Sequence, residues 1–461
     1  MKKVTTLSLL ALSFFLLTAG IIDLGNLPNY ANQTKPSYII KDNTPANNSI
    51  SDKGATLGRV LFYDKKLSLD NSTSCASCHQ QEFAFSDTAA LSAGINGLTG
   101  RHSMRLVNAR FSNEGRFFWD ERAATLEDQT TRPIQDHIEM GFSGANGDPG
   151  LDSLFKKLAG TDYYPELFKF VYGDPQITEV RMQMALAQFV RSIQSFDSKF
   201  DAGRAQVASN TVSFPNFTTQ ENLGKSLFFS PPPMGGAGCF RCHAAPEFSI
   251  DPASLNNGVI GKAGQPGQID LTNTKAPSLR DLINPNGTLN GPLMHTGEFT
   301  SLMQVLNHYN DLTANPLNTN LDHRLAGAMH DLNLTQVQKE AIVAFLGTLT
   351  GTDLYTNEKW SDPFDPDGSI TILPISSGTF TLGTGPVWKV FPNPAFGSVY
   401  VEIEPGDYQL NIHDSKGGLI HSARISGNST FDLTGKPSGI YSCSLLDLKT
   451  NQRFVKKLVK K

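Results

Sequence analysis

Two short motifs of the same form constrain this chain more than any other feature. Each has two cysteines separated by two residues and a histidine directly after the second cysteine: Cys75-Ala-Ser-Cys78-His79 and Cys239-Phe-Arg-Cys242-His243. This spacing is the attachment signature of c-type haem, in which two thioethers hold the porphyrin edge and the histidine ligates the iron. We therefore predict two covalently bound c-type haems, with His79 and His243 as iron ligands.

Paired cysteines also occur in zinc sites and in disulfides. The two pairs of a zinc ribbon lie about 15–20 residues apart, far closer than these two motifs, and a zinc site needs no histidine after each pair. Disulfides are the ordinary use of cysteine pairs in exported chains, but they do not explain two motifs of identical form. The pattern favours haem over both. The fifth cysteine, Cys443, is expected to be an inert strand residue.

The first twenty residues have the form of a secretory signal peptide. Lys2 and Lys3 precede an apolar run, and small residues follow at 18–20. The apolar run is shorter than the ~20 residues that span a bilayer. The formal net charge is -4 and the lysines and arginines are scattered, so no basic surface for nucleic acid is indicated. We predict an exported protein without a nucleic-acid partner.

The two motifs lie within a longer internal repeat. Leu-Gly-Arg-Val-Leu-Phe at 57–62 precedes the first motif, and Leu-Gly-Lys-Ser-Leu-Phe at 223–228 precedes the second. Downstream, residues 118–126 match residues 294–302 in layout. Each half of the repeat is therefore expected to be one cytochrome-like module that carries one haem.

The same repeat predicts different iron ligands in its two halves. Carried past Trp119 and its counterpart His295, it aligns Pro133 with Tyr309. Proline cannot ligate iron, whereas tyrosine can do so as a phenolate. We expect the second haem to be closed by His243 and Tyr309 and the first to keep an open face. The rival readings are a core tyrosine at 309, or ligation by one of two nearby residues, His308 and Met303.

Hydrophobic periodicity and capping patterns predict helices in both halves. One covers residues 179–200, one runs from Thr335 to near Gly351, and a third opens at Thr218 with Glu221 three residues on. The first two are expected to bury Val180, Met184, Ala187, Val190, Ile193 and Phe196, and Val337, Ala341, Phe345 and Leu349, respectively.

Apolar and polar residues alternate in the C-terminal part of the chain, which predicts β-strands and a small sandwich. The alternating apolar positions are Val399, Val401 and Ile403, then Tyr408, Leu410 and Ile412, then Tyr441, Cys443 and Leu445. Between this part and the helical part, Pro, Gly, Asp and Ser predominate, which is typical of a linker.

A chain of 461 residues is long enough for several cores. The predicted fold is mainly α, with two tandem cytochrome c-like domains followed by a small all-β sandwich. The expected segments are a signal peptide at 1–20, an N-terminal haem domain at 50–215, a C-terminal haem domain at 216–352, a linker at 353–388 and the β-sandwich at 389–461.

Residues 54–351 resemble the bacterial dihaem cytochrome c peroxidase and MauG family. Besides the two haem motifs, the resemblance is carried by residues 118–122, Gln129, residues 133–134, 139–141, 275–280 and 294–297. It implies that hydrogen peroxide is reduced at the open N-terminal haem with electrons relayed from the C-terminal haem. Trp119 would relay electrons, and Gln129 and Glu139 would lie beside the peroxide, with Glu139 moving its proton.

The resemblance also implies an electron donor, and it leaves two alternative functions. A small redox protein or other donor would supply electrons. Because family members often dimerise, a homodimer is a further expectation. In classical peroxidases a methionine is the sixth ligand of the second haem, so Tyr309 is closer to the MauG branch. A MauG-like oxidase of a protein or organic substrate is therefore one alternative. A non-enzymatic electron-transfer cytochrome is the other.

Two further departures from the family pattern concern the first haem and calcium. The loop at 80–101 has no histidine that could close the first haem, which is expected to stay open. The family binds calcium between the haems, with an asparagine among its ligands, but His102 stands at that place here. The other contacts to calcium would fall near Asn290 and Pro292. One calcium ion is still expected, but the replacement of the asparagine by His102 weakens this expectation.

The C-terminal part resembles a type IX secretion sorting domain. The motifs are Phe-Pro-Asn-Pro at 391–394, Ser-Gly-Ile-Tyr at 438–441 and a basic end at 456–461. A carbohydrate-binding or adhesion module is the alternative, because one fold hosts many functions. The resemblance implies passage through the periplasm and then a cell-surface or extracellular location.

Overall fold

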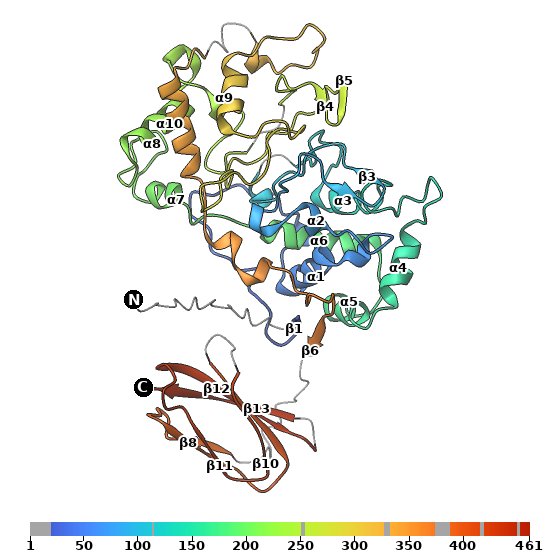
Figure 1. The fold of residues 1–461 in the computed structure, drawn as a ribbon, viewed down its shortest axis with the longest axis vertical. Coiled ribbons are helices and arrows are strands. Elements are labelled where there is room, and N and C mark those ends of the chain that lie inside the picture. The colour runs from blue at the N-terminus through green and yellow to red at the C-terminus, as the bar shows by residue number, and fades with distance from the viewer. Residues whose placement is uncertain are drawn as a thin grey trace, which may run out of the picture. The chain divides into compact units, whose positions relative to one another are not determined.

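A computed structural model describes residues 20–112, 115–249, 254–326, 332–373, 388–414, 419–449 and 452–461. The chain divides into two compact units, residues 1–373 and 374–461 (Figure 1). The expected signal peptide, apart from Gly20, and residues 374–387 of the expected linker lie outside the described residues. Within the described part of the chain, no helix is both long and apolar enough to cross a membrane.

The first unit mixes helices with short strands and long irregular segments. Its helices are α1 (Asp52–Tyr63), α2 (Cys75–Cys78), α3 (Leu126–Thr131), α4 (Leu151–Ala159), α5 (Tyr164–Tyr172), α6 (Glu179–Ser192), α7 (Lys199–Arg204), α8 (Thr219–Phe229), α9 (Leu302–Asn310) and α10 (Gln336–Gly347). Its strands are β1 (Ile21–Asp23), β2 (Ala93–Gly94), β3 (Gly97–Leu98), β4 (Gly261–Lys262), β5 (Gln265–Ile269) and β6 (Thr371–Leu373). The prediction of a mainly α chain is not confirmed, because the segments around both motifs form turns and isolated bridges and the second unit is a sheet structure.

The first lobe of this unit is built on the pair α1 and α6. A Cβ on Gly58 of α1 would overlap the Ala185 carbonyl oxygen of α6, so glycine lets the two backbones approach closely. Leu57, Leu61 and Phe189 are fully buried in the core that this pair forms.

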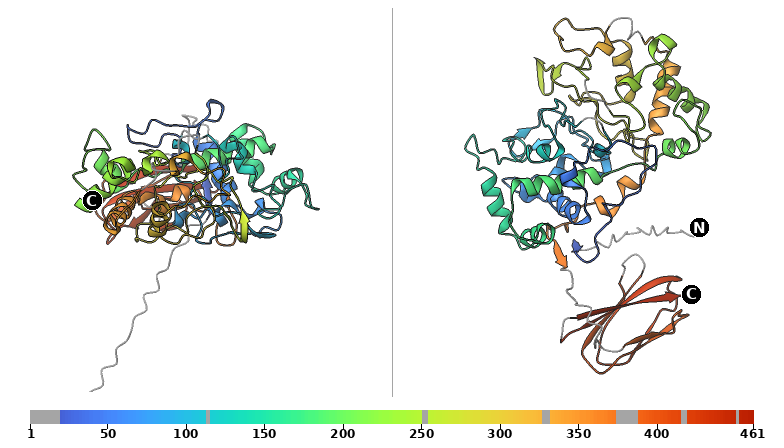
Figure 2. Two further views of the ribbon diagram at one scale, coloured as in Figure 1. Left: turned by 90° about the horizontal axis from the view of Figure 1, so that it is seen from above. Right: turned by 180° about the vertical axis from the view of Figure 1, so that it is seen from behind.

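The second lobe repeats this packing with α8 and α10, and Figures 1 and 2 show the two helices side by side. A Cβ on Gly224 of α8 would overlap the Ala341 carbonyl oxygen of α10. Both helices begin with the predicted capping boxes, at Thr218 and at Thr335. The internal repeat therefore extends to the contact between equivalent helices.

The predicted helix boundaries and faces need correction. α6 ends at Ser192 rather than Phe200, because the Asn108 side chain binds both the N–H (2.9 Å) and the carbonyl (3.1 Å) of Ser195 and holds that segment extended. α10 ends at Gly347 instead of continuing to Gly351. Two residues predicted to be buried are exposed, since Val180 (61% exposed) and Val337 (65%) lie in first turns, turned away from the cores.

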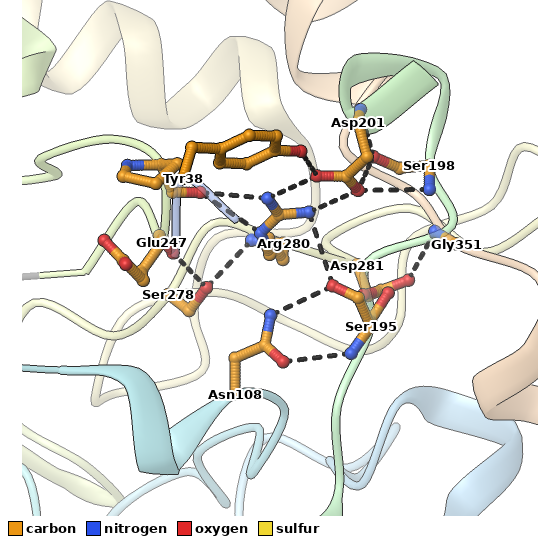
Figure 3. A network of polar contacts seen from close by, with 11 residues as sticks. Tyr38, Asn108, Ser195, Ser198, Asp201, Glu247, Ser278, Arg280, Asp281 and Gly351 are labelled. Carbon is orange, nitrogen blue, oxygen red and sulfur yellow. Dashed lines mark hydrogen bonds and ion pairs between the residues drawn. The ribbon is translucent and has the colours of Figure 1, made fainter. Parts of the chain in front are cut away.

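A buried polar network anchors the segment that follows α6 (Figure 3). The Arg280 guanidinium makes two 2.8 Å bonds to the Asp201 carboxylate and one of 3.3 Å to the Ser195 carbonyl, and the Tyr38 hydroxyl donates to Asp201 at 2.8 Å. Burial alone would raise the pKa of Asp201, but the Arg280 charge holds that pKa below its ordinary value. Phe200, beside Asp201, packs in the second core although it precedes the expected domain boundary at 215.

The second unit is a β-sandwich, as predicted. Its strands are β7 (Lys389–Phe391), β8 (Ser398–Glu402), β9 (Tyr408–His413), β10 (Leu419–Ile425), β11 (Ser429–Asp432), β12 (Gly439–Asp447) and β13 (Gln452–Lys460). They form one sheet in the order β10-β9-β12-β13 and another in the order β11-β8-β7. The predicted alternating residues of β8, β9 and β12 are buried in one core, which includes Cys443.

Candidate haem sites

The first motif lies in a cavity with the predicted peroxide-site residues. The cavity is lined by Cys75, Cys78 and His79 and, from the segments that follow, by Gln129, Pro133 and Glu139. Gly94 and Thr99 of the loop after the motif also line it. The structure therefore brings together two of the three residues predicted to be catalytic, Gln129 and Glu139.

The second motif lies in a larger cavity with the predicted tyrosine. Cys239, Cys242 and His243 line it together with Tyr309 of α9. The rival ligands do not: the His308 ring nitrogen Nε2 lies 3.0 Å from the Asn257 carbonyl oxygen, and the Met303 sulfur faces Gln336 on the surface. The geometry therefore favours Tyr309 over both rivals.

Each motif histidine faces the backbone carbonyl of a phenylalanine that follows it in the chain. Nδ1 of His79 lies 3.0 Å from the Phe85 carbonyl oxygen, and Nδ1 of His243 lies 3.2 Å from that of Phe248. Both phenylalanines have left-handed backbones, with φ values of 57° and 55°, which are strained for a bulky residue and are typical of functional sites. An Nδ1–H that donates to a carbonyl leaves Nε2 for a metal.

The surroundings of these histidines fit haem. Burial lowers the pKa of His79, and it lowers the pKa of His243 to about 4, so both rings are held in the neutral form that ligates metals. Each ring shares its cavity with two thiols at the correct spacing. The residues present therefore match the donors that a c-type haem requires.

Glu139 is placed for proton exchange. The Asp136 carboxylate accepts hydrogen bonds from the N–H groups of Ile138 and Glu139, which fixes the turn that carries Glu139. Burial, with a smaller contribution from the negative charge of Asp136, raises the pKa of Glu139 to about 7, against an opposing effect of Arg122. A carboxyl group with this pKa can accept and release protons near neutral pH.

Trp119 lines the second cavity rather than the first. Its indole N–H donates to the His102 carbonyl oxygen at 2.7 Å, and its ring lies 6.3 Å from the His295 ring. Arg105 lines the second cavity and its neighbour Leu106 lines the first. The backbone that holds the indole thus runs between the two cavities.

Sequence reasoning missed two residues that line the second cavity, Met294 and Arg105. Asn257 approaches both the Tyr309 hydroxyl and the Met294 sulfur at 3.4 Å, so Met294 lies beside the predicted ligand. The repeat held a sign of this, because Met294 aligns with Phe118 and both have left-handed backbones. Arg105 is the other: its buried Nε has no hydrogen-bond partner among the described residues, and it is suited to bind a haem propionate.

The residues where the resemblance puts calcium give it few side-chain ligands. Nδ1 of His102 lies 3.0 Å from the Ala89 carbonyl oxygen and Nε2 lies 3.3 Å from the Ser86 hydroxyl, so both ring nitrogens have partners. Calcium prefers oxygen ligands. The Asn290 side-chain nitrogen donates to the Asp281 carbonyl and the Tyr355 hydroxyl, and its buried oxygen Oδ1 has no hydrogen-bond partner among the described residues. Among the described residues there is also no group of three or more acidic, histidine or cysteine side chains that could hold a metal.

Two cavities, each with a Cys-x-x-Cys-His motif and a buried histidine, define a dihaem c-type cytochrome. Residues 52–208 match the family model described as di-haem cytochrome c peroxidase. The methylamine utilization protein MauG of Methylorubrum extorquens is 30% identical over 315 residues, covering 66% of this chain and 80% of that protein. The cytochrome c551 peroxidase of Nitrosomonas europaea is 28% identical over 389 residues, covering 82% and 96%.

A solved structure also supports a relationship to MauG-like proteins. The crystal structure of a MauG-like protein associated with microbial copper homeostasis superposes with a TM-score of 0.57 and 28% sequence identity, covering 72% of this chain and 99% of that one. The chain belongs to the dihaem cytochrome c peroxidase and MauG family, whose members are oxidoreductases. Membership implies the two c-type haems that the motifs predicted.

Residues 389–461 match the family model of a secretion system C-terminal sorting domain. This match coincides with the β-sandwich, and it confirms the prediction that the C-terminal part directs export by type IX secretion.

Proposed function

We propose that this protein reduces hydrogen peroxide at the first haem site with electrons that enter at the second. The single observation that carries this proposal is the difference between the two cavities, one with Pro133 and the other with Tyr309 at the equivalent place. When bound, the haems would supply one-electron chemistry and, at the first site, an iron position open to peroxide. The overall reaction consumes one peroxide, two electrons and two protons and forms two waters.

Glu139 moves the proton in this proposal. Its carboxylate would take a proton from one peroxide oxygen and deliver it to the other, so that water is the leaving group. The raised pKa supports both steps, because the group accepts and releases a proton at similar cost near pH 7. Gln129 lines the same cavity and would orient the peroxide through its side-chain amide.

Electrons would pass between the haem sites by way of Trp119, whose carbonyl oxygen also accepts hydrogen bonds from Thr274 and Lys275 of the second lobe. The two lobes would be tandem cytochrome c-like domains, since each has one motif and one core. Membership of Phe200 and Phe214 in the second core supports a division before α7 rather than at residue 215. A small redox protein would supply the electrons, and a homodimer stays a prediction.

A MauG-like oxidase is the second candidate, and Tyr309 favours it. A hard anionic phenolate stabilises oxidised iron more than a thioether does, so the second site would be a poor entry point for electrons of high potential. The oxidising power would then be directed at a protein or organic substrate. The non-enzymatic reading requires both irons to be closed by protein ligands, and Pro133 cannot provide one.

Electron paramagnetic resonance of the oxidised protein, combined with a turnover assay, tests the proposal. We expect one high-spin and one low-spin iron, and peroxide consumption coupled to oxidation of a reduced small cytochrome c. Slow turnover with the cytochrome but rapid reaction with peroxide would favour the oxidase. Two low-spin irons that do not react with peroxide would overturn both.

A further inference from the structure

A β-hairpin closes over the loop that carries Glu139. The hairpin comprises residues 92–99 with β2 and β3. The N–H of Ile95 donates to the Glu139 carbonyl at 3.1 Å, and the N–H of Asn96 donates to the Ile138 carbonyl at 3.1 Å. The Asn96 side chain adds a bond of 2.8 Å to the His137 carbonyl. Three consecutive carbonyls of the Glu139 loop are therefore held by two residues at the tip of the hairpin.

Gly94 packs directly against the backbone of this loop. A Cβ at position 94 would overlap the Ile138 carbonyl oxygen and would lie 2.8 Å from the Glu139 Cα. Both atoms belong to the backbone, so no side-chain rotation could relieve the overlap. Any larger residue at this position must push Glu139 or the hairpin away.

The base of the hairpin is fixed, so the hairpin cannot easily yield. The Ser92 hydroxyl donates to the Asp87 carboxylate at 2.6 Å, and the Ser92 N–H donates to the Thr99 hydroxyl at 3.0 Å. Ser92, Thr99 and Asp87 are all buried. Because the base is held in this way, the hairpin cannot move as a whole, and a Cβ at position 94 would strain its contact with the Glu139 loop.

We infer that Gly94 is a positioning residue for Glu139: its lack of a side chain lets the hairpin seat against the loop and sets where the Glu139 carboxyl lies in the first cavity. This inference rests on the proposed function of Glu139. The hairpin belongs to the same loop in which no histidine is available to close the first haem, so the loop acts here as the wall that holds the proton carrier in place.

Gly94→Ala tests the inference in the full-length holoprotein, with Gly100→Ala as the matched control. A Cβ at Gly100, in the same loop, would meet nothing within 4 Å. We expect Gly94→Ala to slow the stopped-flow reaction with peroxide by about 10- to 100-fold, since a shift of about 1 Å can cost 10²-fold. We also expect its pH profile to shift, with haem content and absorption spectra unchanged. Gly100→Ala should match the native protein in every measurement.

A double variant shows whether Gly94 acts through Glu139. If it does, Gly94→Ala combined with Glu139→Gln should be no slower than Glu139→Gln alone. An additional loss in the double variant, or a native rate and pH profile in Gly94→Ala, would overturn the inference. If Gly94→Ala does not fold, Asn96→Ala, which removes only the bond to His137, should show a smaller effect in the same direction, and a native rate and profile would overturn it. A native rate in Glu139→Gln would instead refute the proposed function.

Discussion

Pro133 and Tyr309 occupy equivalent places in the two cavities. Each lies the same number of residues after the N-cap of a matching helix, Thr125 for α3 and Ser301 for α9. α3 ends at Thr131, before the proline, whereas α9 continues to Asn310 and keeps the tyrosine helical. The difference between the two sites is thus a difference in side chain and in helix length at one repeat position.

Tyr309→Phe should change the spectrum of one haem only. We expect the low-spin signal in electron paramagnetic resonance to be lost or replaced by a high-spin signal, because phenylalanine cannot ligate iron. Met303→Leu serves as the control and should leave both signals native, since Met303 does not line the cavity. An unchanged spectrum for Tyr309→Phe would exclude it as the ligand and direct attention to Met294.

Glu139→Gln should slow the reaction with peroxide by about 10²- to 10⁴-fold, the usual contribution of a general acid–base group. A pKa of about 7 leaves the carboxyl protonated below that pH and anionic above it. Since the first step needs the anion, the native rate should rise as the pH increases through about 7, and the variant should lack this rise. Glu82→Gln, at an exposed glutamate near the first motif, should keep the native profile. A rise that persists in Glu139→Gln would assign it to another group.

Chelation should not affect the protein. Because calcium prefers oxygen ligands and the imidazole of His102 stands where the family has an asparagine, we expect dialysis against EGTA to leave spectra and peroxide turnover unchanged. Elemental analysis should find two irons per chain and no stoichiometric calcium. One calcium per chain, removed together with turnover, would contradict this.

Asp201→Asn should lower the free energy of unfolding by about 3–5 kcal/mol, because it leaves the buried Arg280 charge without its partner. The lowered pKa of Asp201 means that the native carboxylate contributes stability above its unfolded pKa, about 4, and loses this contribution as the pH falls toward the folded value. Chemical denaturation at several pH values should show that the variant lacks this part of the acid-side loss. Asp162→Asn, at an exposed site, should be within about 0.5 kcal/mol of native.

Removal of residues 389–461 should change the cellular location of the protein without changing its reaction with peroxide. The first unit has its own cores and both motifs, so the truncated protein should still bind two haems and react with peroxide. Without the sorting domain it should accumulate in the periplasm, as cell fractionation would show. Surface or extracellular recovery of the truncated protein would contradict the role of the domain.

Local sequence patterns predicted the features that depend on local chemistry. The motifs, the capping boxes at Thr218 and Thr335 and the alternating strands all appear in the structure. The end of α6 could not be predicted, because Asn108, far away in sequence, binds the backbone of Ser195 in place of a helical turn. The partners of Trp119 and the places of Met294 and Arg105 also depend on contacts between the two halves, which no local pattern records.

The hydrogen bond from the Trp119 indole to the His102 carbonyl has a chemical consequence. A peptide carbonyl is an extremely weak base, so an indole that lost an electron here would keep its N–H proton and remain a radical cation. Electron transfer through Trp119 would then occur without proton transfer. Its rate would be insensitive to pH and to solvent deuteration, even where the chemistry at Glu139 responds to both.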